Sequence, residues 1–287
     1  MPKLLVVATP IGNLNDMTAR MREALESCDL IAAEDTRVTM KLTQVLGIHK
    51  PMISCHRHNE DAKKDAIIER MLAEDLTVAL TCDAGTPGIS DPGEALVAAA
   101  WEADIPVEPV CGPSAIVTAL SVSGFDTRAF AFYGFLPRES KSMGEALKSI
   151  KSAGVSPAVI YESPHRVVEL LSHIARSLPG ARVTVCCDLS KKFERIDRGD
   201  AGEIYERLKH MDNVEKGEYC VVMDFDADEA QQAPEAVAAL SPEMLLAQEL
   251  LSGKTMPEAT DALKAQGVKR NDIYRARLRI KELADRL

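Results

Sequence analysis

The sequence predicts two α/β domains followed by a small helical module. Apolar runs rich in Val, Ile and Leu alternate with segments of helical spacing up to about residue 225. At 287 residues the chain is longer than one average domain. Residues 241–287 have the spacing of helices. Alternating strands and helices are typical of a parallel sheet covered by helices.

The first domain is predicted over residues 1–124. Its strands are expected, in order, at LLVVAT, DLIAAE, LTVALT and VEPVCG. The helices that follow them are expected at DMTARMREALESC, TRVTMKLTQVLG, DPGEALVAAAWEA and PSAIVTALSVSG. A further helix, EDAKKDAIIERMLAED, precedes the third strand. Four parallel strands are therefore expected in this domain.

The second domain is predicted over residues 125–225, with strand directions left open. Its strands are expected at FAFYGF, AVIYES, VTVCCDL and EYCVVMDF, and its helices at SMGEALKSIKSAG, PHRVVELLSHIARSL and AGEIYERLKH. Residues 226–240 are acidic and alanine-rich and predict a linker. Three helices are expected over residues 241–287, with Ser241 and Thr255 as N-caps and Asn271 as a weaker candidate.

Composition and cysteine usage narrow the class of protein. Apolar residues make up 46% and charged residues 27% of the chain, which is typical of a folded domain. No apolar stretch approaches the length of a membrane span, and the first residues lack a signal peptide. The seven cysteines are an odd number without a CxxC pair. We expect a cytoplasmic protein without a metal site.

Basic residues gather at the end of an otherwise acidic chain. The net charge is −10, yet residues 264–287 hold eight Lys or Arg and three Asp or Glu, a balance of +5. A solvated helix face is the usual explanation. A basic module could also bind the phosphates of a nucleic acid. The candidate contacts are Lys269, Arg270, Arg275, Arg277 and Arg279.

Residues 81–93, TCDAGTPGISDPG, follow the third predicted strand. A glycine-rich loop at this place can offer backbone N–H groups to a ligand. The chain has neither GxxxxGK[ST] here nor GxGxxG after its first strand. Asp83 and Asp91 suit a ligand with an amine, a sulfonium or ribose hydroxyls better than a pyrophosphate. Alternatively the loop only makes turns, and for Asp91 before Pro92 we expect a helix N-cap.

Three other loops of similar chemistry follow predicted strands: ATPIGNLNDMT, AEDTR and CGPSA. The carboxyl ends of parallel strands meet at one edge of a sheet. We therefore expect the four loops to lie around one ligand.

Eight motifs, taken together and in order, carry a resemblance to a known family. They are VATPIGNLNDMT (7–18), AEDTR (33–37), HRHNE (56–60), DAGTPGISDPG (83–93), GPSA (112–115), GFLPRES (134–140), YESPHRV (161–167) and EKGEYCVV (215–222). The chain resembles the ribosomal RNA small-subunit methyltransferase I family, a group of tetrapyrrole-methylase-like, class III S-adenosylmethionine (SAM) methyltransferases. The resemblance extends from Lys3 to about Val222, and the terminal helices are similar to the family's C-terminal domain.

The resemblance implies a SAM cleft between the two α/β domains and a homodimer. It also implies methylation of a cytidine ribose 2′-hydroxyl in the decoding region of small-subunit (16S) rRNA, either bare or within the assembled subunit. The implied cofactor-binding residues are Pro10, Asp83, Ala84, Gly85, Thr86, Pro87, Ser114, Ala115, Phe135, Leu136 and Tyr161. Where the family pattern has an arginine–glutamate pair before its Leu-Thr-Lys motif, this chain has Cys187 and Asp188 before LSKKFE.

Transfer to a ribose hydroxyl requires a group that removes its proton. The candidates are Glu34, Asp35, His56, His58 and Glu162. Each has a structural alternative: Asp35 can cap a helix, the histidines can bond to backbone, and Glu162 can pair with Arg166. For the histidines we favour the structural role. The crowding of Glu34, Asp35 and Arg37 favours a catalytic role for these three, with Arg37 on a substrate phosphate or a carboxylate and Asp35 or Glu34 orienting the hydroxyl.

Two other functions use the same features. One is methylation of a tetrapyrrole, corrinoid or porphyrinogen, because one fold can host several substrates. The other is a sensor that binds SAM without turnover. The basic tail and the AEDTR and YESPHRV motifs favour RNA.

Overall fold

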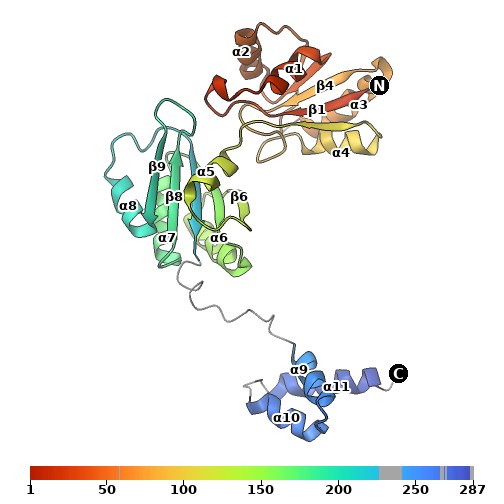
Figure 1. Cartoon of the computed structure of the whole chain (residues 1–287), viewed down its shortest axis with the longest axis vertical. Helices are drawn as coiled ribbons and strands as arrows, with labels where there is room; N and C mark the ends of the chain where they lie inside the picture. The colour runs from red at the N-terminus through yellow and green to blue at the C-terminus, as the bar shows by residue number, and fades with distance from the viewer. Residues whose placement is uncertain (58, 226–240, 266–267, 269, 285–287) are drawn as a thin grey trace. The chain divides into compact units, whose positions relative to one another are not determined.

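The computed structural model describes residues 1–57, 59–225, 241–265, 268 and 270–284 (Figure 1). The predicted linker 226–240, His58 and Lys269 lie outside the described residues. By its internal contacts the chain divides into two compact units, Met1–Asp228 and Glu229–Leu287. The predicted boundary between residues 124 and 125 falls inside the first unit and stays a prediction.

The first sheet is parallel throughout, as predicted, and has the strand order β3-β2-β4-β1-β5. Its strands are β1 (Lys3–Val7), β2 (Leu30–Ala33), β3 (Met52–Ser54), β4 (Thr77–Thr81) and β5 (Val107–Val110). Strand β3 was not among the predicted strands. This strand has three residues, follows Pro51 and lies at the sheet edge, so it is too short to show a pattern.

Helices cover both faces of the first sheet. They are α1 (Ala19–Ser27), α2 (Thr36–Leu46), α3 (Glu60–Glu74) and α4 (Glu94–Glu102), with a 3-10 turn η1 (Leu14–Asp16) before α1. Successive side chains of a strand point to opposite faces. Accordingly Leu4 packs in the core that includes Met71 of α3 and Leu96 of α4, whereas Leu5 packs in the core that includes Leu25 of α1. This arrangement leaves the carboxyl ends of the strands free to hold loops.

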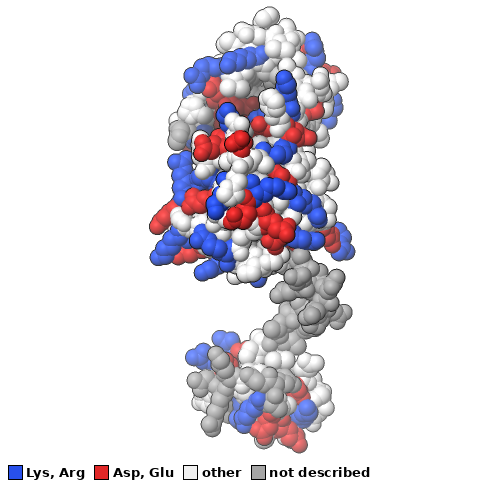
Figure 2. All heavy atoms as spheres, turned by 90° about the vertical axis from the view of Figure 1, so that its left-hand side faces the viewer, with Lys and Arg blue, Asp and Glu red and all other residues white. Residues whose placement is uncertain are grey.

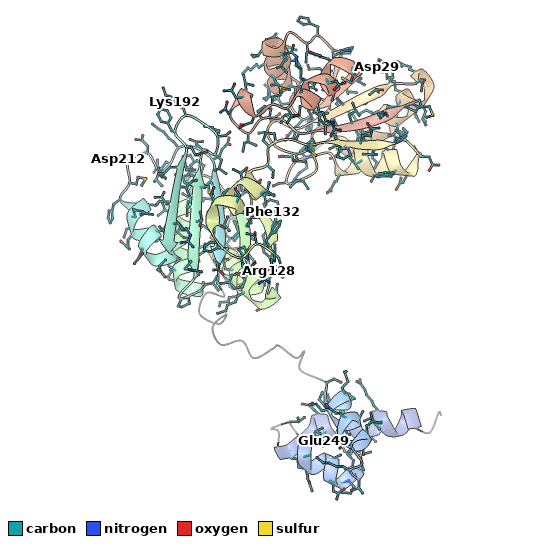
Figure 3. All side chains as sticks on the ribbon, in the orientation of Figure 1. Asp29, Arg128, Phe132, Lys192, Asp212 and Glu249 are labelled. Carbon is teal, nitrogen blue, oxygen red and sulfur yellow. The ribbon has the colours of Figure 1, made fainter. Side chains whose placement is uncertain are left out.

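The second sheet is mixed and has the order β6-β7-β10-β8-β9. Its strands are β6 (Ala131–Phe135), β7 (Ala158–Glu162), β8 (Arg182–Cys187), β9 (Arg195–Asp200) and β10 (Tyr219–Asp224). Only β6 and β7 pair in parallel. The edge strand β9, RIDRGD, was missed because its charges hide the strand pattern, as is common at sheet edges. Lys192 projects from the loop between β8 and β9 (Figure 3).

Helices also cover both faces of the second sheet. On one face lie α6 (Ser140–Ala153), α7 (Val167–Ser177) and α8 (Ala201–Lys209). On the other face lies α5 (Ala115–Ser123), whose Ile116 and Leu120 pack in one core with Val159 and Val222. The predicted boundary at residue 124 groups α5 with the first sheet, but the helix packs on the second.

The second unit contains the three predicted helices, α9 (Pro242–Leu251), α10 (Met256–Ala265) and α11 (Arg270–Ala284). Leu246, Leu263 and Ile273 form its core with Ala259 and Ala276. Ser241 caps α9 by accepting a hydrogen bond from the backbone N–H of Met244. Asn271 is not the cap of α11, because that helix begins one residue earlier.

Charges of both signs are mixed on one face of the molecule. On the face shown in Figure 2, Lys and Arg side chains are interspersed with Asp and Glu side chains. No helix within the described residues is long and apolar enough to cross a membrane. All seven cysteines are free, and all except Cys111 are buried. Neither sign of charge dominates the face in Figure 2. Binding of an anionic partner there would therefore depend on the particular Lys and Arg side chains at the contact, not on a net positive charge.

Candidate active site

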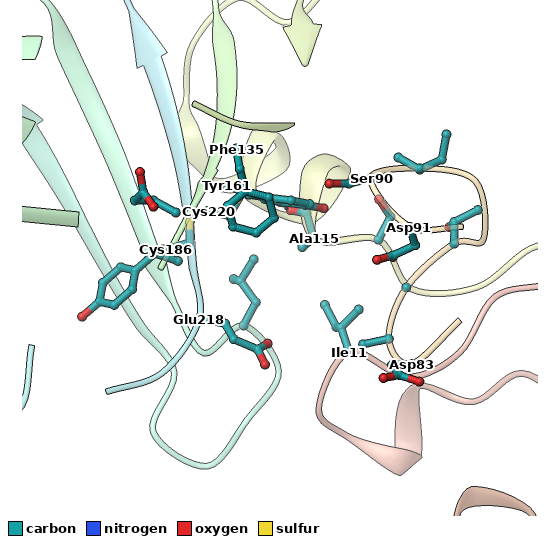
Figure 4. Close-up of a pocket in the computed structure, with 18 of the residues that line it drawn as sticks. Ile11, Asp83, Ser90, Asp91, Ala115, Phe135, Tyr161, Cys186, Glu218 and Cys220 are labelled. Carbon is teal, nitrogen blue, oxygen red and sulfur yellow. Dashed lines mark hydrogen bonds between the residues drawn. The ribbon is translucent and has the colours of Figure 1, made fainter. Parts of the chain in front are cut away.

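A cavity of about 490 Å³ lies where the first-sheet loops face the ends of the second-sheet strands (Figure 4). On the first-sheet side it is lined by the loops after β1, β2 and β4, including Ile11, Glu34, Asp83 and Asp91. Tyr161 contributes to the second-sheet side. The volume falls within the range of small-molecule sites.

Most of the residues expected from the resemblance meet at this cavity. The predicted cofactor residues that line it are Asp83, Ala84, Gly85, Thr86, Ser114, Ala115, Phe135 and Tyr161, together with the catalytic candidates Glu34 and Glu162. Pro10, Pro87, Leu136, Asp35 and Arg37 are not among its lining residues. Leu136 instead packs in the core beneath the second sheet.

Much of the cavity lining, above all on the second-sheet side, was not predicted from the sequence. On the second-sheet side the lining residues that were not predicted are Ser163, Pro164, Cys186, Leu189, Glu218, Tyr219 and Cys220. On the first-sheet side they are Ile11, Ile89 and Ser90, whereas Asp91 was considered for the ligand but expected to cap a helix. Glu218, Tyr219 and Cys220 belong to the recognised EKGEYCVV motif, which was a usable signal. Their position follows from the antiparallel pairing of β10 with β7 and β8, which the sequence pattern did not reveal.

Backbone hydrogen bonds join the loop after β4 to the loops after β1 and β2. Thr9 and Gly85 exchange two N–H···O bonds of 2.8 and 3.0 Å. The N–H of Asp83 donates to Glu34 Oε2 at 3.1 Å, and the N–H of Asp35 donates to Asp83 Oδ1 at 3.2 Å. The reciprocal bonds hold the Glu34 and Asp83 carboxylates beside each other at the cavity.

Asp91 is not the predicted helix cap. Helix α4 begins at Glu94, and its first N–H groups bond to a distant side chain instead. The buried Oε1 of Glu60 accepts from the N–H groups of Gly93 and Ala95 at 2.9 Å and of Leu96 at 3.3 Å. A Cβ at Gly93 would lie 3.0 Å from Leu80 Cδ2, and the φ of +135° also favours glycine. Asp91 is thereby left free to line the cavity.

The cavity concentrates negative charge. Burial raises the pKa of Asp91 to about 6, and repulsion by Glu34 and Asp83 adds to the shift. The pKa values of Glu34 and Asp83 are also raised, chiefly by burial. Arg57 acts in the opposite direction on Glu34 and Asp91, and its Nη2 donates to the carbonyl of Ser90 at 3.0 Å. A cationic ligand would relieve this repulsion.

Asp91→Asn is expected to stabilise the unliganded protein in a pH-dependent way. The folded-state pKa of about 6 lies above the ordinary 3.8. The stability linked to the protonated form is therefore present at low pH and lost as pH rises through 6. The gain in thermal midpoint for Asp91→Asn should grow between about pH 4 and 6 and stay constant above about pH 7. An equal gain at all pH values would contradict it, and the exposed Asp212→Asn is the control.

The structural alternative for Asp35 is present in the molecule. Its Oδ1 accepts from the N–H of Arg37 at 2.8 Å, so Asp35 caps α2. The Arg37 side chain pairs with the same carboxylate at 2.6 Å and is 86% exposed. Hydrogen bonds from Arg37 lower the pKa of Asp35 to about 2. Asp35 is therefore a weak proton acceptor.

Glu162 both lines the cavity and pairs with Arg166. The side chain is buried, its Oε1 accepts from the N–H of Ser163 at 2.7 Å, and its Oε2 lies 3.3 Å from Arg166 Nη2. Burial raises the pKa of this carboxyl group despite the arginine.

The neighbouring Tyr161 ring packs against Phe132 and Phe135, with centroid distances of 4.9 and 5.8 Å. His56, another candidate, bonds through its backbone N–H to Asn59 Oδ1 at 2.8 Å.

Lys191 joins the two sides of the cavity rim. Its Nζ pairs with Glu218 at 2.9 Å and with Asp188 at 3.2 Å, and its hydrocarbon chain crosses the backbone of Gly12. A Cβ at Gly12 would lie 2.3 Å from Lys191 Cγ. Only glycine permits this approach at a φ of +154°.

Gly12→Ala is expected to lower the free energy of unfolding by about 1–3 kcal/mol, because the methyl group displaces Lys191 and strains the backbone. Denaturant titration measures the loss. Lys191→Ala is the reference, and Gly12→Ala with Lys191→Ala should recover part of the loss because the clash is gone. Strictly additive effects of the two substitutions would contradict the predicted contact.

The two sheets and the cavity at their strand ends occur in a known class of protein. Residues 3–205 match the family described as Tetrapyrrole (Corrin/Porphyrin) Methylases. Solved structures agree on the fold: the methyltransferase CobJ has a TM-score of 0.58 at 15% identity and covers 79% of this chain and 95% of its own. Uroporphyrin-III C-methyltransferase from Thermus thermophilus, complexed with S-adenosyl homocysteine, has a TM-score of 0.51 at 15% identity and covers 77% and 96%.

Curated relatives narrow the assignment. The Ribosomal RNA small subunit methyltransferase I of Escherichia coli O157:H7 is 40% identical over 274 residues, which are 95% of this chain and 93% of the relative. The protein of the same name from Bacillus subtilis (strain 168) is 40% identical over 240 residues, covering 82% and 81%. The chain belongs to the ribosomal RNA small subunit methyltransferase I family of the tetrapyrrole methylases.

Proposed function

We propose that the chain transfers a methyl group from SAM to the 2′-hydroxyl of a cytidine in the decoding region of 16S rRNA. The observation that carries this proposal is the acid-lined cavity built from the family motifs, in a chain 40% identical to a named small-subunit rRNA methyltransferase. The cavity supports the cofactor, and the relatives support the class of acceptor.

The lining residues fit SAM by their chemistry. The ligand carries a sulfonium and an ammonium group, which the carboxylates of Glu34, Asp83 and Asp91 would attract. Its ribose hydroxyls can donate hydrogen bonds to the same carboxylates. Ile11 and Leu189 supply apolar surface suited to an adenine ring. When bound, SAM supplies an activated methyl group, so the chain has only to position the acceptor and accept one proton.

Glu34 is the proton acceptor that the cavity supports best. It lines the cavity, and burial raises its pKa, which brings a carboxylate closer to the range useful for general base catalysis. Glu162 is the second candidate, although its ion pair with Arg166 also gives it a structural role. Asp35 would act indirectly, since it caps α2 and holds Arg37, which would contact a substrate phosphate.

The helical unit would help to dock the substrate. Arg275, Arg277 and Arg279 are exposed on α11, and Arg279 pairs with Glu243 at 3.0 Å. Together with Lys269 and Arg270 these cations would contact phosphates of the RNA or of the assembled small subunit. The resemblance further supports a homodimer, and a ribosomal substrate supports a cytoplasmic location.

The fold by itself is also compatible with a tetrapyrrole acceptor, which is the alternative function. The solved neighbours that act as uroporphyrin-III methyltransferases are only about 15% identical to this chain and share its fold. The likeness to the rRNA methyltransferases is much greater, at 40% identity. The RNA acceptor is therefore favoured over a porphyrinogen or corrinoid.

The test is transfer of labelled methyl from SAM to isolated small ribosomal subunits that lack the modification. We expect label in the 16S rRNA, at one position that resists alkaline cleavage because its 2′-hydroxyl is blocked. Bare rRNA is tested in parallel to identify the preferred form of the substrate. Binding of SAM without label in any RNA would reject the proposal, and label in a porphyrinogen would support the alternative.

A further inference from the structure

The loop between β8 and β9 holds an aromatic ring in solvent. Phe193 is 76% exposed, and Lys192 Nζ lies 5.5 Å from the centroid of its ring. Lys192 projects from the same loop (Figure 3). Single exposed apolar side chains are common and need no explanation by themselves. The setting of this ring is less ordinary in two respects.

The first is that hydrogen bonds hold the loop to its own backbone and to Glu218, the residue before β10. Asp188 and Glu218 are joined by two bonds, from the N–H of Asp188 to the carbonyl of Glu218 at 2.9 Å and from the N–H of Glu218 to Asp188 Oδ1 at 3.3 Å. The N–H of Ser190 donates to Glu194 Oε2 at 2.6 Å, and the N–H of Glu194 donates to the carbonyl of Lys191 at 3.1 Å. These bonds close the segment that contains Phe193, so the ring is presented on a pre-organised loop.

The second is the position of the loop at the cavity rim. Leu189, four residues before Phe193, lines the cavity wall. Lys191 crosses Gly12 and pairs with Glu218, which also lines the cavity. The exposed ring thus belongs to the segment that borders the proposed cofactor site. A macromolecular acceptor entering the cavity would pass this rim.

The charges beside Phe193 favour a nucleotide as the group that contacts its ring. The two neighbouring lysines differ: Lys191 is paired with Asp188 and Glu218, whereas no carboxylate of the described residues forms an ion pair with Lys192. An aromatic face beside an available cation matches a nucleotide, whose base can stack and whose phosphate can pair with an ammonium group. A cytidine positioned for methylation has neighbours whose bases can be unstacked in this way.

We propose that Phe193 and Lys192 form a nucleotide-contact platform, on which Phe193 stacks a base of single-stranded RNA adjoining the methylated nucleotide and Lys192 contacts its phosphate. This inference rests on the proposed function, since it requires an RNA acceptor in the cavity. A second copy of this chain is the competing occupant of the ring, and it predicts a change of oligomeric state instead.

The experiment compares wild type with Phe193→Ala, Phe193→Trp and Lys192→Gln, using full-length protein and unmodified small subunits. Phe130→Ala is the matched control, because Phe130 is exposed and does not line the cavity. KM for the subunit and kcat are measured with SAM in excess, and SAM affinity is measured by calorimetry. Light scattering reports the oligomeric state.

Phe193→Ala should raise KM for the subunit about 10-fold or more, the usual effect of losing one base stack, with SAM affinity and oligomeric state unchanged. Phe193→Trp should retain most of the affinity. Lys192→Gln should weaken binding and reduce the salt slope of the RNA affinity by about one contact. If KM were unchanged in Phe193→Ala, or if this variant changed its oligomeric state, the proposed nucleotide-contact platform would be rejected. The proposed function would not be affected by either result. Absence of methyl transfer by wild type would reject the proposed function itself.

Discussion

Methyl transfer by Asp83→Ala is expected to fall about 100-fold, with most of the loss in SAM affinity. Asp83 lines the cavity and accepts a bond from the N–H of Asp35 at 3.2 Å. Its removal takes away a carboxylate that would face a cationic ligand, and hydrogen bonds to charged groups contribute about 1.5–3 kcal/mol each. It also leaves the N–H of Asp35 without this acceptor. Calorimetric SAM binding and single-turnover transfer measure the two effects separately.

Asp83→Asn and Asp212→Ala are the controls for this result. Asn retains an acceptor for the N–H of Asp35 but not the charge, so a loss close to that of Asp83→Ala would assign the effect to charge. Asp212 is exposed and does not line the cavity, so its variant should behave as wild type. Full SAM affinity in Asp83→Ala would remove Asp83 from the cofactor site.

Glu60→Ala is expected to lower the free energy of unfolding by about 3–5 kcal/mol, since it leaves buried N–H groups at the start of α4 without their acceptor. Glu60 is 6% exposed and its Oε1 accepts from three backbone N–H groups. Denaturant unfolding followed by circular dichroism measures the loss. Because the loop with Asp91 precedes this helix, SAM affinity should fall as well.

Glu60→Gln retains a side-chain oxygen in the same place and should lose about half as much or less. Glu69→Ala, on the exposed face of α3, should have little effect on stability. If Glu60→Ala were no less stable than Glu69→Ala, the N-terminus of α4 would have to be satisfied in another way.

The sequence predicted the first-sheet side of the cavity well because its residues lie in short motifs directly after strands. Glu34 and Asp83 each follow a buried strand of a parallel sheet, so their meeting required no knowledge of distant pairing. Leu189 and Glu218 lie on the other side because β8 and β10 pair antiparallel. That pairing depends on contacts between distant segments, which local periodicity does not report.

The prediction that Asp91 caps a helix was wrong for the same reason, a contact between segments that are distant in the sequence. An aspartate before a proline is a good local signal for an N-cap. Glu60, which lies 33 residues from Gly93 in the sequence, supplies the acceptor in its place. The strands β3 and β9 escaped detection for another reason: one is very short and the other is rich in charge, and both lie at sheet edges.

The position of α5 restricts how this chain could be recombined with its relatives. The helix follows β5 of the first sheet but packs its apolar face on the second sheet. The chain therefore crosses from the first sheet to the second at residues 111–114. Ser114 and Ala115, at the end of that passage, also line the cavity. A hybrid joined there would place its junction within the candidate active site. Exchange of one half would therefore alter the site, and substitutions in the two halves are expected to be interdependent.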